Sequence, residues 1–172
     1  MSNDLRYPIG EYDPKPFSIP QKVEWLADIK FLPLQLESAV LNLDEKQLLT
    51  PYRDGGWTIQ QLVHHVADSH INAYCRFKLG LTEENPTIKP YEEADWALLS
   101  DYRMPVEPSL RIIEGLHQRW VTMLETFTED EWNRTFVHPA SGATMQLKKA
   151  LALYAWHSKH HLAHVTETVK TF

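Results

Sequence analysis

The stretch that most constrains the fold follows Gly142. Residues 143–172 contain no proline or glycine, and their apolar residues recur at steps of three and four. This spacing is typical of one face of an α-helix. The sequence therefore predicts a long C-terminal helix that begins at Thr144 and buries its apolar face against other elements.

The first quarter of the chain predicts one long helix preceded by an irregular arm. Residues 1–17 are rich in proline and glycine, which favours an arm without regular structure. Ser18 and Gln21 then fit a helix start, and apolar residues follow at helical spacing over residues 20–43. Because Pro33 lacks a backbone N–H, it should kink or locally break this helix.

Two further helices are expected in the middle of the chain. Thr58 and Gln61 form a capping-box pattern, and the helix that follows should end at Gly80. A third helix should begin near Pro108, because proline is well tolerated in a first helical turn. Residues 81–108 contain four prolines, so they predict a long crossover that includes a short helix rather than one continuous helix.

Beyond the third helix, residues 128–131 predict another short helix and residues 136–144 a loop or a small hairpin. Four long helices joined by one long crossover are typical of a four-helix bundle. We therefore expect an all-α fold in a single domain over residues 1–172: a four-helix bundle with a long crossover connection and short extra helices.

Charge and composition exclude several classes of protein. The net charge is −6 with histidine neutral, and Lys and Arg are scattered, which argues against binding to nucleic acid. No apolar run approaches about 18 residues, and the first ten residues lack the pattern of a signal peptide. The one cysteine, Cys75, excludes an intramolecular disulfide and is expected to be a small buried apolar residue. We therefore expect a cytoplasmic protein that binds neither nucleic acid nor membranes.

The most informative residues are the histidines of the C-terminal helix. The chain has nine histidines, and four of them lie between residues 157 and 164. They form two pairs spaced four residues apart, a spacing that places both members on one helix face: His157 with His161, and His160 with His164. At roughly 100° per residue, His161 and His157 lie roughly 40° and 80° from Leu147, and the other pair lies farther from this apolar centre. We therefore expect His157 and His161 to face the core, and His160 to be a surface residue or to support a ligand.

Two imidazoles one turn apart on the core side can share a metal ion, although an ordinary hydrogen-bonded histidine is the alternative for each. A metal ion needs at least one more ligand, and the second helix offers His64, His65 and His70. Periodicity places His70 near the centre of the apolar face and His65 at its edge, which alone favours His70. The spacing leaves the choice of a third ligand open.

Five segments carry a resemblance to a known family: YPIGEY at 7–12, PYRDGGWT at 51–58, GGWTIQQLVHHVADSH at 55–70, RFKLGLTEENP at 76–86 and WHSKHHLAHV at 156–165. Together they resemble the DinB/YfiT-like superfamily, and most closely its branch of metal-dependent hydrolases and bacillithiol transferases. The resemblance implies a four-helix bundle of unusual connectivity, a bound divalent zinc or nickel ion, and a homodimer.

The resemblance also implies three metal ligands. Family members place a metal-binding histidine eight residues after the motif tryptophan, which implies His65, eight residues after Trp57. The other two ligands form a pair four residues apart on the last helix, which implies His157 and His161. His164 stands where many members have a glutamine, so this chain departs from the family pattern next to the ligands.

Three neutral imidazoles leave at least one coordination position for water or substrate, as in catalytic zinc sites. An ion held in this way can activate water for hydrolysis, or a thiolate for transfer to an electrophile. Asp68, three residues after His65, could orient a ligand or accept a proton, although a solvated helix residue is the ordinary alternative.

The first functional hypothesis is therefore a metal-dependent hydrolase acting on a small-molecule substrate. One alternative is a bacillithiol-type thiol S-transferase in detoxification, which would use a low-molecular-weight thiol. A second alternative is a non-catalytic metal-binding bundle of the stress response.

Overall fold

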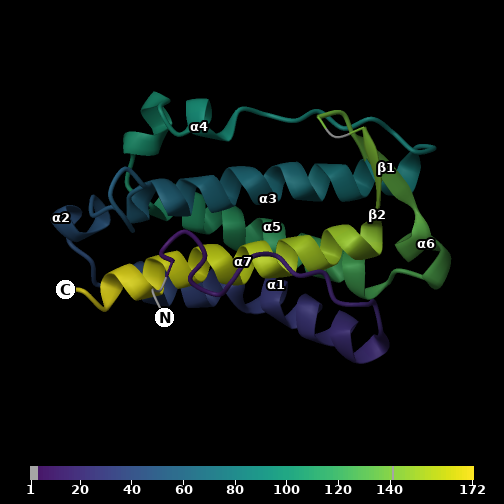
Figure 1. Cartoon of the computed structure of the whole chain (residues 1–172), viewed down its shortest axis with the longest axis horizontal. Coiled ribbons are helices and arrows are strands. Elements are labelled where there is room, and N and C mark those ends of the chain that lie inside the picture. The colour runs from purple at the N-terminus through teal and green to yellow at the C-terminus, as the bar shows by residue number, and fades with distance from the viewer. Residues whose placement is uncertain (1–3, 141) are drawn as a thin grey trace.

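Four long helices form the body of the molecule. The computed structural model describes residues 4–140 and 142–172. The long helices are α1 (Ile19–Val40), α3 (Ile59–Thr82), α5 (Glu107–Glu125) and α7 (Leu147–Val169). They lie side by side along the longest axis (Figure 1). The predicted all-α four-helix bundle is confirmed, and the predicted long crossover connects α3 to α5.

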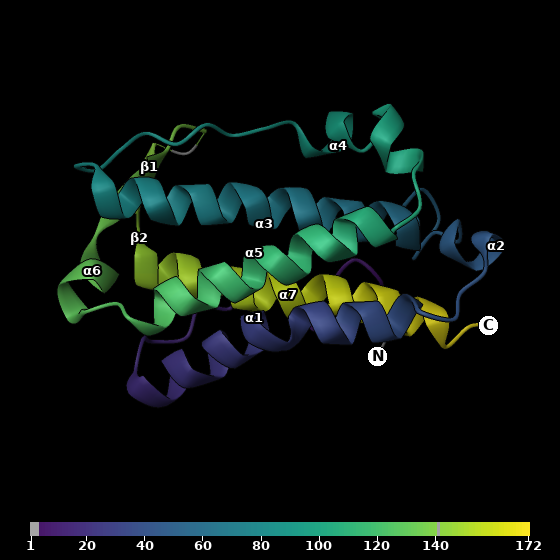
Figure 2. The ribbon, with the colours of Figure 1, turned by 180° about the vertical axis from the view of Figure 1, so that it is seen from behind.

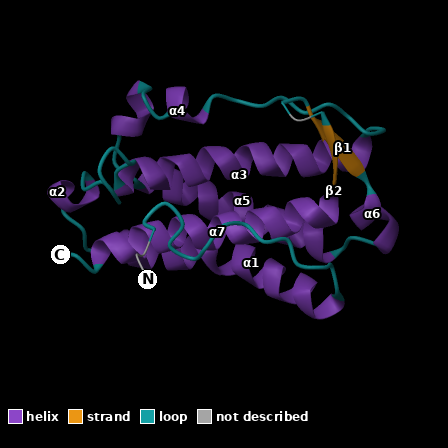
Figure 3. Cartoon of the chain, in the orientation of Figure 1, coloured by secondary structure: helices purple, strands orange, loops and turns teal. Residues whose placement is uncertain are grey.

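In the described part of the chain, six short elements accompany the long helices: α2 (Glu45–Leu48), α4 (Glu93–Trp96), η1 (Ser100–Arg103), α6 (Glu129–Asn133), β1 (Thr135–His138) and β2 (Ala143–Gln146). The two strands pair antiparallel, with Thr135 opposite Gln146, at one end of the bundle (Figure 3). This hairpin confirms one of the two forms predicted for residues 136–144. Ser141 of the hairpin and residues 1–3 of the arm lie outside the described residues.

Helix α1 begins where the sequence predicts it. The Ser18 side chain accepts a hydrogen bond from the backbone N–H of Gln21 at 3.3 Å, which caps the first turn. Pro33 lies inside the helix, yet α1 is continuous from Ile19 to Val40, so the proline does not break it. The ribbon of α1 changes direction partway along its length (Figure 2), as expected where a proline removes a helical hydrogen bond.

Two predicted helix ends are wrong, and both errors lie where α3 meets α7. Helix α3 runs through Gly80 to Thr82, so this glycine is not a stop signal. A Cβ atom at Gly80 would lie 3.0 Å from Leu147 Cδ2, so the glycine instead allows the start of α7 to approach closely. Thr144 does not open α7, because residues 143–146 pair with β1 and the helix begins at Leu147.

The buried apolar residues divide into two clusters along the bundle. One contains Phe77 and Trp120, and the other contains Leu62 and Ile113. On α3, α5 and α7 the boundary between the clusters falls at a histidine: His70, His117 and His157 respectively, of which the first two are buried. The core therefore holds a polar layer across three helices. Within residues 4–140 and 142–172, no helix is both long and apolar enough to cross a bilayer.

Candidate metal centre

Three histidines from two helices come together between α3 and α7. His65 lies on α3, and His157 and His161 lie one turn apart on α7. One ring nitrogen from each lies within 4.8 Å of the others. The Nε2 atoms of His65 and His157 are 3.3 Å apart. The structure therefore brings together the three residues that the family resemblance implies as ligands.

The spacing of these nitrogens fits a metal ion. Zinc–nitrogen bonds are about 2.0–2.1 Å, so two ligand nitrogens on a tetrahedral ion are about 3.3 Å apart. The two Nε2 atoms of His65 and His157 are separated by that distance. Two facing imidazole nitrogens must share either a proton or a cation, since both cannot donate. The donor set therefore suits a divalent ion of the kind that binds imidazole.

Burial keeps these imidazoles neutral. It lowers the pKa of His65 to about 4, and the nearby His160 ring adds to the effect. Burial likewise lowers the pKa of His157 and His161 well below the ordinary imidazole value, again with a contribution from neighbouring histidines. A neutral imidazole keeps a lone pair, which a metal ligand requires. The site is thus ready to bind a cation at neutral pH.

A second group, His160, His161 and His164, also has ring nitrogens within 4.8 Å of one another. His164 Nε2 donates to the backbone oxygens of Leu5 and Arg6 at 3.1 and 3.2 Å, so only its Nδ1 atom is available to this group. We favour the group that includes His65, because its nitrogens come from two helices and the Nε2 atoms of His65 and His157 are 3.3 Å apart.

His160 occupies the space between the arm and α7. Its ring stacks on Trp156, with ring centroids 4.3 Å apart, and Tyr7 of the N-terminal arm lies against it. Only 7% of His160 is exposed, so the expectation of a surface residue is wrong. Periodicity within α7 could not predict this, because the face that it assigns to solvent is covered by the N-terminal arm.

Asp68 lies apart from the histidine cluster. Its Oδ2 accepts a hydrogen bond from Tyr102 of the crossover at 2.8 Å, and burial raises its pKa. Among the described residues, the two groups able to hold a metal contain histidines alone, so Asp68 belongs to neither.

Cys75 is exposed, which makes the expectation of a buried cysteine wrong. Trp57 packs on the ring of His65 at a centroid distance of 4.6 Å.

Two polar residues next to His157, and a third behind them, complete the site. Ser69 Oγ lies 3.3 Å from His157 Nε2, and His70 Nε2 lies 3.0 Å from His157 Nδ1. His70 is fully buried, as its position on the apolar face predicts. Sequence reasoning missed Ser69 and His117, whose Nε2 lies 2.8 Å from His70 Nδ1. One signal could have found His117: it continues the three-and-four spacing of the apolar stripe on α5.

Fold and site together define a class: a four-helix bundle that places a cluster of histidines between two of its helices. Known proteins are similar to this chain in sequence and fold. The sequence profile of the DinB superfamily matches residues 32–165. A relative from Bacillus cereus and one from Bacillus anthracis are each 52% identical over 169 residues, covering 98% of this chain and 97% of theirs. Both are named "putative metal-dependent hydrolase".

A solved structure is similar over the same length. YfiT from Bacillus subtilis aligns with a TM-score of 0.94 and 47% sequence identity, over 98% of this chain and 97% of that one. It is described as a probable metal-dependent hydrolase with an unusual four-helix bundle topology. The chain belongs to the DinB superfamily.

Proposed function

We propose that this chain is a metal-dependent hydrolase of a small molecule, with His65, His157 and His161 holding one divalent ion. The 3.3 Å approach of two Nε2 atoms from different helices is the observation that carries this proposal. The names of the relatives support it, since they describe metal-dependent hydrolases. Imidazole ligands suit zinc or nickel, and we propose one of these two ions.

A divalent ion bound here would lower the pKa of a coordinated water to about 7, or that of a coordinated thiol. The chain itself supplies three neutral imidazoles, which leave the positive charge of the ion uncompensated. An anionic fourth ligand would therefore be favoured on an ion held here. Ser69 Oγ lies 3.3 Å from His157 Nε2, and its hydroxyl group would donate a hydrogen bond to such a ligand.

The same charge imbalance supports a second candidate, a thiol S-transferase. A thiolate is an anion and compensates the charge of an ion held by neutral ligands, as hydroxide does. A low-molecular-weight thiol would then be the nucleophile, and an electrophilic small molecule its acceptor. The two candidates share the metal site and differ in which anion attacks.

Metal analysis of purified variants tests the site. We expect about one zinc or nickel ion per chain in the wild type and a strong loss of metal in His157→Ala. His160→Ala is the matched control, because it removes a buried histidine of the same helix from outside the proposed ligand set. Full metal content in His157→Ala would overturn the assignment.

Paired activity assays then test the reaction. Metal-loaded wild type would be compared on a panel of esters and amides, and on a thiol with a chlorinated electrophile, with His157→Ala measured in parallel. Metal-dependent cleavage of an ester or amide supports the hydrolase. Turnover of the thiol reaction alone would replace it with the transferase, and a metal-binding protein inactive in both assays would contradict the two enzyme proposals.

A further inference from the structure

A chain of three imidazoles leads away from the candidate metal centre into the core. His157 Nδ1 lies 3.0 Å from His70 Nε2, and His70 Nδ1 lies 2.8 Å from His117 Nε2. His117 Nδ1 lies 2.7 Å from the backbone oxygen of Ile29 on α1. Four helices are thereby connected through consecutive hydrogen bonds, since the rings belong to α7, α3 and α5 in turn.

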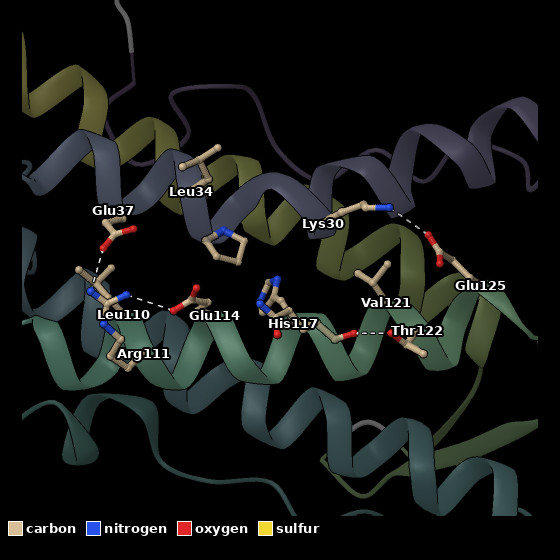
Figure 4. Close-up of a pocket in the computed structure, with 12 residues that line it drawn as sticks. Lys30, Leu34, Glu37, Leu110, Arg111, Glu114, His117, Val121, Thr122 and Glu125 are labelled. Atoms are coloured by element: carbon tan, nitrogen blue, oxygen red, sulfur yellow. Dashed lines mark hydrogen bonds and ion pairs between the residues drawn. The ribbon is translucent and has the colours of Figure 1, made fainter.

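His117, the last imidazole of this row, lies beneath a groove between α1 and α5. The groove has a volume of about 400 Å³, and His117 lines it together with Pro33 and Leu34 (Figure 4). Although His117 borders the groove, only 1% of the residue is exposed. Burial lowers the pKa of His117 to about 4, so the ring is neutral and carries a single N–H.

The backbone oxygen of Ile29, at the end of the row of imidazoles, determines where each proton lies. A carbonyl oxygen can only accept, so His117 Nδ1 carries the hydrogen and His117 Nε2 keeps a lone pair. His70 Nδ1 must then donate to that lone pair, which leaves His70 Nε2 as an acceptor. His157 Nδ1 donates to His70 in turn, so the lone pair of His157 lies on Nε2.

Pro33 explains why the oxygen of Ile29 is available inside a helix. In an α-helix the oxygen of residue 29 accepts the N–H of residue 33. Pro33 has no N–H, so this oxygen lacks its usual helical donor and accepts the N–H of His117. The proline that costs α1 one hydrogen bond thus supplies the fixed acceptor on which the order of protons depends.

We propose that His70 and His117 are positioning residues that hold His157 in the Nδ1–H form, with its Nε2 lone pair directed at the metal. The inference rests on the proposed metal site and extends it to two buried residues outside the proposed ligand set. It also separates His157 from the other two proposed ligands. Among the described residues, the Nδ1 atoms of His65 and His161 are buried and have no hydrogen-bond partner.

Nitrogen-15 NMR of the metal-free protein tests the order of protons directly. Two-bond proton–nitrogen correlations distinguish the Nδ1–H and Nε2–H forms of each histidine. We expect His157, His70 and His117 all to be in the Nδ1–H form at neutral pH. An Nε2–H form at any of the three rings would overturn the proposal, whatever reaction the protein catalyses.

Zinc affinity of matched variants tests the positioning role. His70→Leu removes the acceptor of the His157 N–H, and we expect zinc to bind roughly 10- to 100-fold more weakly, the range found when such partners are lost. His70→Gln offers an amide oxygen in the same direction and should restore most of the affinity. If His70→Leu bound zinc like the wild type, or if the Gln variant were as weak as the Leu variant, the proposal would be wrong.

His64→Leu is the control for a merely structural effect. His64 is a buried histidine on the same helix, but its hydrogen bonds go to Ser109 and to the backbone oxygen of Met104. We expect His64→Leu to lower the midpoint of thermal unfolding and to leave zinc affinity within about threefold of the wild type. An equal loss of zinc affinity in His64→Leu and His70→Leu would assign the effect to stability. None of these measurements depends on hydrolase activity, so the two proposals can fail separately.

Discussion

Helix α7 carries two histidine pairs with the same four-residue spacing and different surroundings. His161 and His160 are almost equally buried, at 8% and 7% exposure. The pair of His157 and His161 faces α3, where another imidazole nitrogen approaches to 3.3 Å. The pair of His160 and His164 faces the N-terminal arm and meets aromatic rings and backbone oxygens. Both pairs therefore share the spacing, and His160 and His161 share the same burial, so it is the atoms opposite each ring that separate the proposed ligands from the residues that hold the arm.

The largest expected difference between the pairs is in metal affinity. His161→Ala removes a proposed ligand, and we expect zinc affinity to fall by more than about 100-fold, beyond the range typical of supporting residues. His160→Ala should change it by less than about threefold. Competition with a chromophoric chelator measures both values. Equal losses would instead indicate that the group of His160, His161 and His164 holds the ion.

The next largest effect concerns acid stability of the metal-free protein. His65 has a pKa of about 4 when folded and about 6.5 when unfolded, so the unfolded chain takes up the proton first as pH falls. The contribution of this ring to the free energy of unfolding should be fully present above about pH 6.5. It should be lost as the pH falls to about 4, a loss of about 3 kcal/mol.

Urea unfolding at several pH values measures this loss. His65→Gln should flatten the dependence. His164→Gln should flatten it less, because backbone oxygens partly oppose the effect of burial on the His164 pKa. The same slope in wild type and His65→Gln would contradict the prediction.

A smaller effect is expected where the arm meets the second pair. His164→Ala removes the hydrogen bond to the oxygens of Leu5 and Arg6, which should cost about 1–2 kcal/mol of unfolding free energy. Amide hydrogen exchange should become faster in residues 4–12 and stay unchanged in α3. Zinc affinity should be preserved. A variant that lost zinc with no change in arm exchange would reverse the roles assigned to the two pairs.

The smallest expected effect comes from the indole beside His160. Trp156→Phe keeps an aromatic ring against His160 but loses the N–H that donates to the Gly10 oxygen at 3.3 Å. We expect a loss of about 0.5 kcal/mol or less, because this bond is long and exposed. Chemical denaturation detects it, and a loss above about 2 kcal/mol would show that the arm contributes more than its contacts indicate.

The sequence predicts the bundle well because its signals are local. Caps at Ser18 and Thr58 and the spacing of apolar residues lie within single helices, so the long helices are found nearly where expected. The inward position of His157 and His161 follows from the same periodicity. The proposal of His65 required the family resemblance, because the histidines opposite a residue at the edge of an apolar face cannot be identified from one helix alone.

The hydrogen-bond partners could not be predicted in this way. The contact of His117 with Ile29 joins residues 88 positions apart, and the covering of His160 depends on an arm far away in sequence. Both arise from how the helices and the arm pack in three dimensions. Pro33 illustrates the difference: its effect on α1 is local and foreseeable, whereas the use of the oxygen it frees depends on α5.

The glycine at the hairpin end of α3 gives the site a sensitivity to changes made far from it. Because Gly80 has no Cβ, Leu147 packs closely against the α3 backbone, and the three proposed ligand residues lie about 15–22 Å farther along the two helices. Because this contact lies at one end of two long helices, we expect a methyl group added at Gly80 to change the angle between α7 and α3. The gap between His65 and His157 would then change although neither histidine had been touched. The spacing of the three proposed ligands is thus a property of how the two helices pack against each other, as well as of the three rings between them.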